Sequence, residues 1–394
     1  MDPQQLLLLA VPAAFIAFGL GWLAARVDIK HLIEGSKALP RSYFRGLNFL
    51  LTEQPDRAID SFIEAVQGDP DTIELHFTLG AMFRRRGETE RAIRIHQSLL
   101  DRADLAQADR DRALLELGRD FLKAGMFDRA ENAFETLRGS TVEAEALGDL
   151  LDIFEIEKEW VKAIDCAREL EARSGAEMTR RIAHYHCELA QFALLQSRFD
   201  EAGREISAAF AALRQSVRAG LLAGELALAA GHVEAAIEAW AALGRQSPQH
   251  LALVADKLMA AYKQTGRADE GLRLLEGSLA QTPSYDVLLV VARETHATAG
   301  PDAAFALLLR ELRRSPTLIG LEQLVQARFA QMPADLAAEL DIVRTLLHQQ
   351  TRRLSRYVCA RCGFKARQHH WHCPGCRNWD SYAPRRAEEL EISS

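Results

Sequence analysis

The 394-residue chain has few aromatic residues, few cysteines and little net charge. Aromatic side chains make up 7% and charged side chains 26% of the residues, proportions that suit a helical repeat protein. Six cysteines are too few at this length to indicate a disulfide scaffold. A net charge of −7 argues against bulk affinity for nucleic acid.

Catalytic motifs are also missing. The chain has no Walker phosphate-binding loop, no Gly-x-Ser-x-Gly nucleophile motif and no His-Glu-x-x-His metal motif. His184, His186 and Cys187 stand close together, but alternate positions along a helix do not converge, so we interpret them as structural. The sequence therefore predicts a protein that is not an enzyme and has no small-molecule substrate.

A repeat with a period near that of tetratricopeptide units dominates the chain. A small residue recurs at steps of 33 to 39 residues: Ala58, Ala92, Ala130, Ala163, Ala202, Ala236, Gly271 and Ala304. Small residues let two short antiparallel helices approach closely, and stacked pairs bury the apolar face that one pair cannot. The fourth and fifth units are degenerate, because Leu151 and Ala190 stand where glycine is usual.

The predicted fold is therefore an all-α superhelical solenoid rather than a plain bundle with accidental spacing. About eight tetratricopeptide units are expected over residues 39–316, followed by capping helices over 317–351. The concave surface of such an array usually binds a peptide or protein. Residues expected to face it are Phe77, Arg84, Arg85, Arg119, Asp152 and Glu155. The alternative is that each is a solvated helix position.

The N-terminal stretch from Leu6 to Ala25 has no charged side chain. Twenty helical residues cover about 30 Å, the thickness of the hydrocarbon layer of a membrane. No Lys or Arg precedes the stretch, which argues against a cleaved signal peptide, and the basic residues after it favour a cytoplasmic main body. We expect a transmembrane anchor at residues 5–25, a juxtamembrane linker at 26–38 and a short N-terminus outside, in the periplasm.

Small residues recur every fourth position within that stretch: Ala13, Ala17, Gly21 and Ala25. In lipid, such a stripe allows close packing against another membrane helix. The alternative is chance, since alanine and glycine are common in membrane spans.

Near the C-terminus stand two Cys-x-x-Cys pairs, Cys359 with Cys362 and Cys373 with Cys376, separated by ten residues. Four thiolates suit a tetrahedral Zn²⁺ ion, and a closed four-thiolate shell is structural rather than hydrolytic. Iron is the alternative metal. Gly363 and Gly375 are expected to permit the tight turns. This ribbon is predicted over 355–384, before a tail at 385–394.

The ribbon lies in a basic part of the chain. From Arg344 to Arg386 there are ten Lys or Arg residues and one acid, Asp380. This end could bind nucleic acid, acidic repeat surface or anionic lipid; protein or lipid fits a membrane-tethered chain better. Trp371, Trp379 and Tyr382 are expected to pack inside the ribbon.

The motif Cys-x-x-Cys-Gly-Phe…Trp-x-Cys-Pro-x-Cys-x-x-Trp, from Cys359 to Trp379, together with the anchor and the repeats, resembles the lipopolysaccharide assembly protein B family of Gram-negative bacteria. The resemblance covers the whole chain. It implies a non-enzymatic inner-membrane adaptor that promotes degradation of LpxC, the deacetylase of the lipid A pathway, by the membrane protease FtsH. It also implies a rubredoxin-like ribbon packed against the repeats, with the four cysteines as metal ligands.

Two departures from a redox-active rubredoxin are Arg377, where glycine often follows the second pair, and the short spacing between the pairs. Both put electron transfer in doubt. An iron-binding electron carrier and a membrane-tethered RNA-binding scaffold remain the alternative functions.

Overall fold

The computed structural model describes residues 73–392, apart from 330 and 355, and scattered positions between 44 and 64. The predicted anchor at 5–25, with its stripe of Ala13, Ala17, Gly21 and Ala25, and the linker at 26–38 lie outside the described residues. Within the described part of the chain, no helix combines the length and the apolar character needed to cross a membrane.

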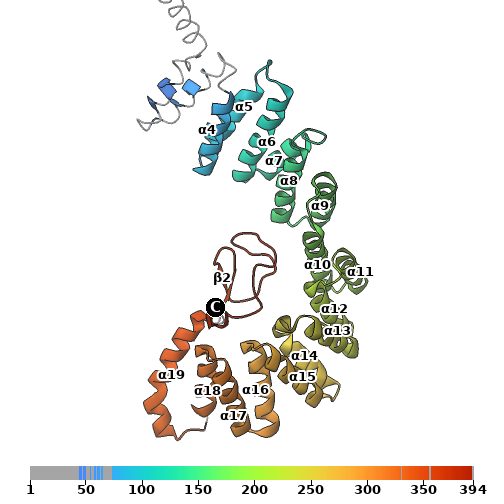
Figure 1. Ribbon diagram of the computed structural model, residues 1–394, viewed down its shortest axis with the longest axis vertical. Coiled ribbons are helices and arrows are strands. Elements are labelled where there is room, and N and C mark those ends of the chain that lie inside the picture. The colour runs from blue at the N-terminus through green and yellow to red at the C-terminus, as the bar shows by residue number, and fades with distance from the viewer. Residues whose placement is uncertain are drawn as a thin grey trace, which may run out of the picture. The chain divides into compact units, whose positions relative to one another are not determined.

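The described chain is a succession of antiparallel helix pairs (Figure 1). The first helices are α4 (Ile73–Arg85), α6 (Gln107–Lys123), α8 (Glu143–Glu157), α10 (Thr179–Leu195), α12 (Val217–Ala229), α14 (Ala255–Gln264), α16 (Tyr285–Ala299) and α18 (Leu318–Phe329). The second helices are α5 (Thr89–Leu100), α7 (Phe127–Glu135), α9 (Trp160–Ser174), α11 (Phe199–Ala212), α13 (Val233–Gln246), α15 (Ala268–Gln281), α17 (Pro301–Arg314) and α19 (Ala334–Leu354). A short 3-10 helix, η2 (Pro248–Leu253), precedes α14. The predicted helical repeat array is confirmed.

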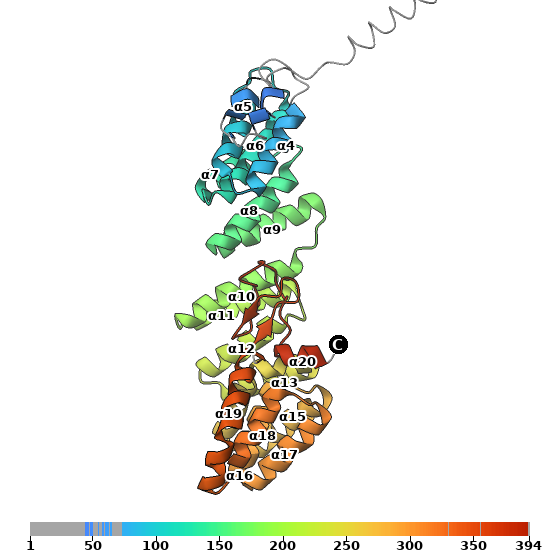
Figure 2. The ribbon, with the colours of Figure 1, turned by 90° about the vertical axis from the view of Figure 1, so that its left-hand side faces the viewer.

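The chain divides into two compact units, unit 1 over residues 1–153 and unit 2 over residues 154–394. Helix α8 runs across the boundary. Unit 2 contains the helices from α9 onward and the C-terminal ribbon, which follows α19 and ends in the short helix α20 (Ala387–Ile392) (Figure 2).

At the helix crossings, a large residue sixteen positions later leaves no room for a side chain, so glycine is required there. A Cβ atom on Gly224 would clash with Nε1 of Trp240, a fully buried side chain. In the degenerate fourth unit the corresponding residues are Leu151 and Ala167, both with 0% exposure. In this unit the large side chain belongs to the first helix and the small one to the second. Glycine is therefore not needed on the first helix.

The turn between the two helices of a unit requires a left-handed backbone. Gly87 and Gly231 adopt it with φ of +81° and +84°. In the fourth and fifth units Lys158 and Ser197 take the same conformation, with φ of +59° and +58°. A residue with a Cβ atom pays about 1 kcal/mol for this geometry, so these two units are strained at their turns as well as altered at their crossings.

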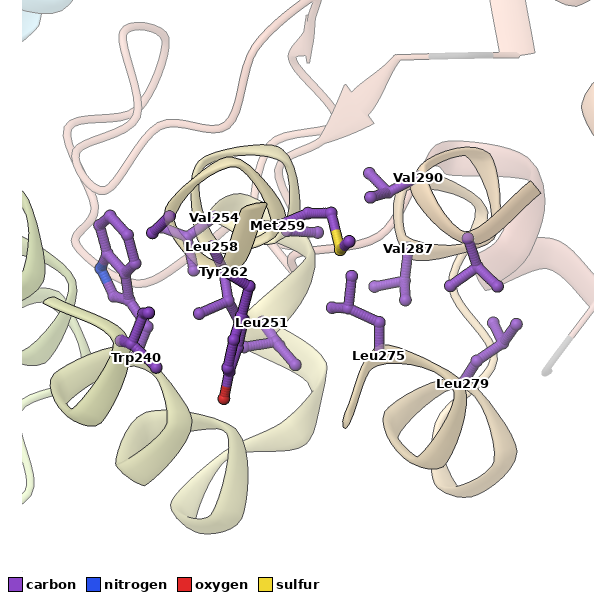
Figure 3. Packing of buried hydrophobic residues seen from close by; sticks show 14 of the residues in the cluster. Trp240, Leu251, Val254, Leu258, Met259, Tyr262, Leu275, Leu279, Val287 and Val290 are labelled. Carbon is purple, nitrogen blue, oxygen red and sulfur yellow. The ribbon is translucent and has the colours of Figure 1, made fainter. Parts of the chain in front are cut away.

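A continuous apolar cluster runs through unit 2 from α12 to α17 (Figure 3). Trp240, Leu258 and Leu275 are fully buried in it. Trp371, which belongs to the ribbon, packs against the same cluster. The ribbon is therefore joined to the apolar interior of unit 2.

Candidate metal centre

The ribbon is built on a short hairpin and two knuckles. Strands β1 (Tyr357–Val358) and β2 (Lys365–Ala366) pair antiparallel, with Tyr357 opposite Ala366. The Gly363 amide donates to the Cys359 carbonyl, and the Arg377 amide donates to the Cys373 carbonyl, both at 2.9 Å. Each knuckle thus closes in the same way.

Gly363 and Arg377 both have a left-handed backbone, with φ of +74° and +55°. Arg377 therefore makes the turn that glycine makes in the first knuckle. Gly375, expected from the sequence to supply it, has another role. A Cβ atom at Gly375 would lie 3.2 Å from Cδ2 of Phe364, so this glycine lets the Phe364 ring pack closely against the second knuckle.

The four cysteines converge at one point. Their Sγ atoms all lie within 4.8 Å of one another, and the Cys359–Cys376 and Cys362–Cys373 pairs are 3.7 Å apart. A tetrahedron with metal–sulfur bonds of about 2.3 Å has sulfur–sulfur edges of about 3.8 Å. The donor set therefore fits a tetrahedral metal ion, and the ribbon is a four-cysteine metal-binding site.

Electrostatics require a cation to hold all four sulfurs as thiolates. Burial opposes the Cys359 thiolate, but hydrogen bonds from the Ser381 side chain and from backbone amides lower its pKa to about 6. The Phe364 backbone amide favours the Cys362 thiolate, yet burial and the neighbouring cysteines raise its pKa to about 12. A bound cation offsets the mutual repulsion of neighbouring thiolates.

The ribbon has a small core of its own, formed by Tyr357, Cys359, Ala366, Cys373 and Tyr382. The sequence analysis expected three aromatic residues to pack inside the ribbon, but of these only Tyr382 lies in that core. The two tryptophans instead face the helices of unit 2, where each contacts a different set of side chains.

Trp379 is held by a buried carboxylate of the array. Glu155, 5% exposed at the end of α8, accepts hydrogen bonds from Trp379 Nε1 at 2.9 Å and from the Tyr185 hydroxyl at 2.6 Å. Arg181 pairs with the same carboxylate at 2.9 Å. Burial and the neighbouring Glu155 raise the pKa of the Tyr185 hydroxyl, so it stays a donor. Glu155 was expected to face a groove, but its carboxylate is occupied by these contacts within the chain.

The Trp379 ring lies between two imidazoles. His184 of α10 stacks on it at 4.7 Å between ring centroids, and His372 of the ribbon stacks at 4.4 Å, both at 18°. His184 Nε2 also lies 2.9 Å from Asp380 Oδ2. Burial favours the neutral acid, but the bonds to His184 and Arg180 hold the pKa of Asp380 below its ordinary value.

The histidines of α10 therefore differ in role. His184 contacts the ribbon through Trp379 and Asp380. His186 pairs with Glu205 of α11 at 2.7 Å, and Cys187 is fully buried, which raises the pKa of its thiol to about 11. These last two remain structural, as the sequence indicated.

The second tryptophan and the end of the chain contact later helices. Trp371 stacks on His250 of η2, with centroids 6.0 Å apart. Asp286, in the first turn of α16, accepts from the Tyr357 hydroxyl at 3.1 Å and from the Arg386 guanidinium at 2.7 and 3.0 Å. Figure 1 shows the ribbon on the inner side of the curve from α10 to α19.

Two successive glutamates of α20 cap two array helices. Glu389 accepts from the Tyr285 amide at 2.7 Å, at the start of α16. Glu388 accepts from the Ile319 amide at 3.0 Å and from the Leu318 amide, at the start of α18. Carboxylates at helix N-termini satisfy free N–H groups and the helix dipole. Sequence reasoning treated these residues as a tail and missed this role.

Three of the other residues expected in the groove differ in burial. Phe77 is 3% exposed and packs with Leu99 and Leu105, so it is a core residue. Arg85 and Asp152 are exposed.

Arg84 and Arg119 belong to a charged network across α4, α6 and α8 in unit 1. Arg84 pairs with Glu116 at 2.6 Å and with Asp120 at 2.8 Å. Arg119 pairs with Glu116 at 2.9 Å and with Asp149 at 2.7 Å. Burial disfavours the Glu116 carboxylate, but the two arginines hold its pKa below the ordinary value. Ion pairs therefore connect the first helices of successive repeats within unit 1.

Comparison with known proteins places the whole chain in one context. The family description "Rubredoxin metal binding domain" matches residues 357–384. Lipopolysaccharide assembly protein B of Escherichia coli K12 is 34% identical over 385 residues, covering 97% of this chain and 98% of that protein. Its Haemophilus influenzae counterpart is 31% identical over 396 residues, covering 96% and 98%. A tetratricopeptide repeat protein from Parabacteroides merdae aligns with 66% of this chain and 99% of its own, at a TM-score of 0.33 and 14% identity.

Proposed function

The chain belongs to the lipopolysaccharide assembly protein B family, and on that premise we propose that it is a non-enzymatic adaptor of the inner membrane. It brings LpxC, the deacetylase of the lipid A pathway, to the membrane protease FtsH, and so limits lipopolysaccharide synthesis. The observation that carries this proposal is the match of almost the entire chain to relatives named for lipopolysaccharide assembly. Repeat arrays of this class act by binding proteins.

Zinc is the proposed metal. The four sulfurs form a closed tetrahedral set, which suits a structural Zn²⁺ ion and leaves no position for substrate. When bound, the ion supplies folding free energy to a ribbon whose own core is small. Metal analysis of the purified chain should give one zinc per chain in a colourless protein. A red protein with reversible reduction would favour the iron-binding electron carrier instead.

The proposed topology has residues 5–25 as a retained anchor, the N-terminus in the periplasm and the bulk of the chain in the cytoplasm. The charge-free stretch and the basic residues that follow it support this arrangement. Ala13, Ala17, Gly21 and Ala25 are the proposed contact with a membrane partner. Protease protection of either end in sealed inner-membrane vesicles tests the orientation.

Steady-state deacetylase abundance in cells tests the adaptor function. The first variant combines Cys359→Ser with Cys362→Ser, and the second lacks residues 1–25. The matched control combines Cys166→Ser with Cys187→Ser, two buried cysteines of the repeat helices.

The deacetylase should accumulate in the first two strains and stay at its normal level in the control, provided each protein is present at normal amounts. A deacetylase level that does not move in either test strain would show that the chain is not a proteolytic adaptor. Accumulation in the control as well would indicate general loss of the protein instead of a role for the ribbon.

A further inference from the structure

The ribbon has a second surface, on the knuckle tips, that the array does not cover. We define the knuckle tips as residues 360–365 and 374–377. Every residue of the first segment is exposed, and so are three of the second. The ring of Phe364 is 44% exposed although its backbone carbonyl accepts from the Cys359 amide at 3.0 Å and from the Tyr382 hydroxyl at 3.2 Å. The phenyl ring is thus presented outward from a fixed backbone.

The knuckle tips carry three cations. Arg361, Lys365 and Arg377 are exposed, and within the described part of the chain none of them pairs with a carboxylate. Arg361 donates to the side-chain carbonyl of Asn378, which joins the two knuckles. No Asp or Glu occurs between residues 357 and 379.

Some exposed arginines elsewhere in unit 2 are neutralised by carboxylates. Arg267 pairs with Glu270 at 2.6 Å, and Arg293 pairs with Asp256 at 2.7 Å. The knuckle tips thus combine three exposed cations, an exposed aromatic ring and a sequence without acidic residues. Such a surface attracts an anionic partner and offers it one apolar contact.

We propose that the knuckle tips dock on the anionic phospholipid surface of the membrane. Each basic residue close to such a surface strengthens binding about fivefold. Aromatic rings favour the boundary between headgroups and hydrocarbon. Lipid fits better than a protein partner because a lone ring with dispersed cations needs only a fluid negative surface. The proposal rests on the membrane tether of the proposed function, which would hold the chain at a lipid surface.

Hydrogen exchange on the full chain tests the proposal. The chain is placed in nanodiscs of phosphatidylcholine with or without phosphatidylglycerol, and exchange of the amides of residues 360–365 is followed. Exchange should be at least about fivefold slower in the anionic discs, and the difference should vanish at high salt. Equal exchange in the two kinds of disc would overturn the proposal.

Two sets of variants separate a local surface from bulk charge. Arg361→Gln, Lys365→Gln and Arg377→Gln together should remove the protection, with metal content unchanged. The control is Arg204→Gln, Arg273→Gln and Arg313→Gln, three exposed arginines on second helices of the array, and should keep it. Loss in both sets would refute a specific surface. Phe364→Ala should weaken protection while the cations still confer salt sensitivity.

A failure of the anchor can be told apart from a failure of the proposed surface. If the chain does not enter nanodiscs, the anchor of the proposed function is wrong. The same exchange measurement is then made after phosphatidylglycerol vesicles are added to the chain in solution. Salt-sensitive protection of the knuckle tips by these vesicles would support the docking surface, and its absence would overturn it.

Discussion

Replacing Trp379 by phenylalanine isolates one bond between ribbon and array. Trp379→Phe keeps an aromatic ring between His184 and His372 but removes the Nε1–H that donates to Glu155 at 2.9 Å. A hydrogen bond to a charged acceptor contributes about 2 kcal/mol, and more is lost when a buried acceptor is left short of a donor. Tyr185 and Arg181 still satisfy this carboxylate, so the lower figure applies.

The expected result is a roughly 30-fold rise in the undocked population, which is 2 kcal/mol at about 1.4 kcal/mol per factor of ten. Native-state hydrogen exchange of the ribbon amides measures it, because exchange through undocking scales with that population. Trp371→Phe is the matched control. Its ring also stacks on a histidine of the array, but its indole nitrogen has no protein acceptor among the described residues. The control should change exchange by less than about fivefold.

Equal effects of the two substitutions would refute the reasoning, since only ring size would then matter. Combining Trp379→Phe with Glu155→Gln provides a further check. The two changes should be less than additive, because both weaken the same hydrogen bond. Fully additive effects would mean that the bond contributes nothing to docking.

Four further outcomes follow from the packing and the charges. Gly224→Ala should destabilise the protein by about 1–3 kcal/mol in thermal unfolding, because its Cβ would clash with Trp240; Gly220→Ala on the same helix, 3.6 Å from Leu243, should not. Glu388→Gln should cost about 1 kcal/mol by weakening the cap of α18, whereas the exposed Glu339→Gln should be neutral in the same assay. Lys158→Gly and Ser197→Gly should each raise the melting temperature through a gain of up to about 1 kcal/mol. The pKa of Glu116 is lowered in the folded state, so its contribution is present above the unfolded value of about 4.3 and is lost as pH falls through the folded pKa; Glu116→Gln should flatten that part of the stability–pH curve.

Local patterns in the sequence predicted the repeat and the metal ligands. A helix pair repeats its packing residues at a fixed interval, so the small residues at positions such as Ala92 and Ala236 mark each unit. The two Cys-x-x-Cys pairs specify the metal site in the same local way, since each pair forms one knuckle. Both signals depend on residues close in the chain.

The contacts between the ribbon and the array could not be predicted in the same way. Trp379 contacts Glu155 across 224 residues of sequence, and Glu389 contacts the Tyr285 amide across 104. Contacts between distant surfaces leave no periodic trace. One signal was available. A module of about thirty residues has too small a core to bury Trp371 and Trp379, so two tryptophans in it indicated an external surface to cover them.

Docking of the ribbon makes the inner surface of unit 2 depend on the metal. Glu155, His184, His250 and Asp286 lie on separate array elements, and each contacts a residue of the ribbon. Loss of the metal removes the free energy that folds the knuckles. The ribbon residues that contact the array lie in or next to the knuckles, so docking should weaken as well. Unpairing Trp379 would leave the Glu155 carboxylate with one donor fewer in a buried site, which favours the docked state. A protein partner of this surface must therefore contact the ribbon itself or compete with its metal-stabilised docking.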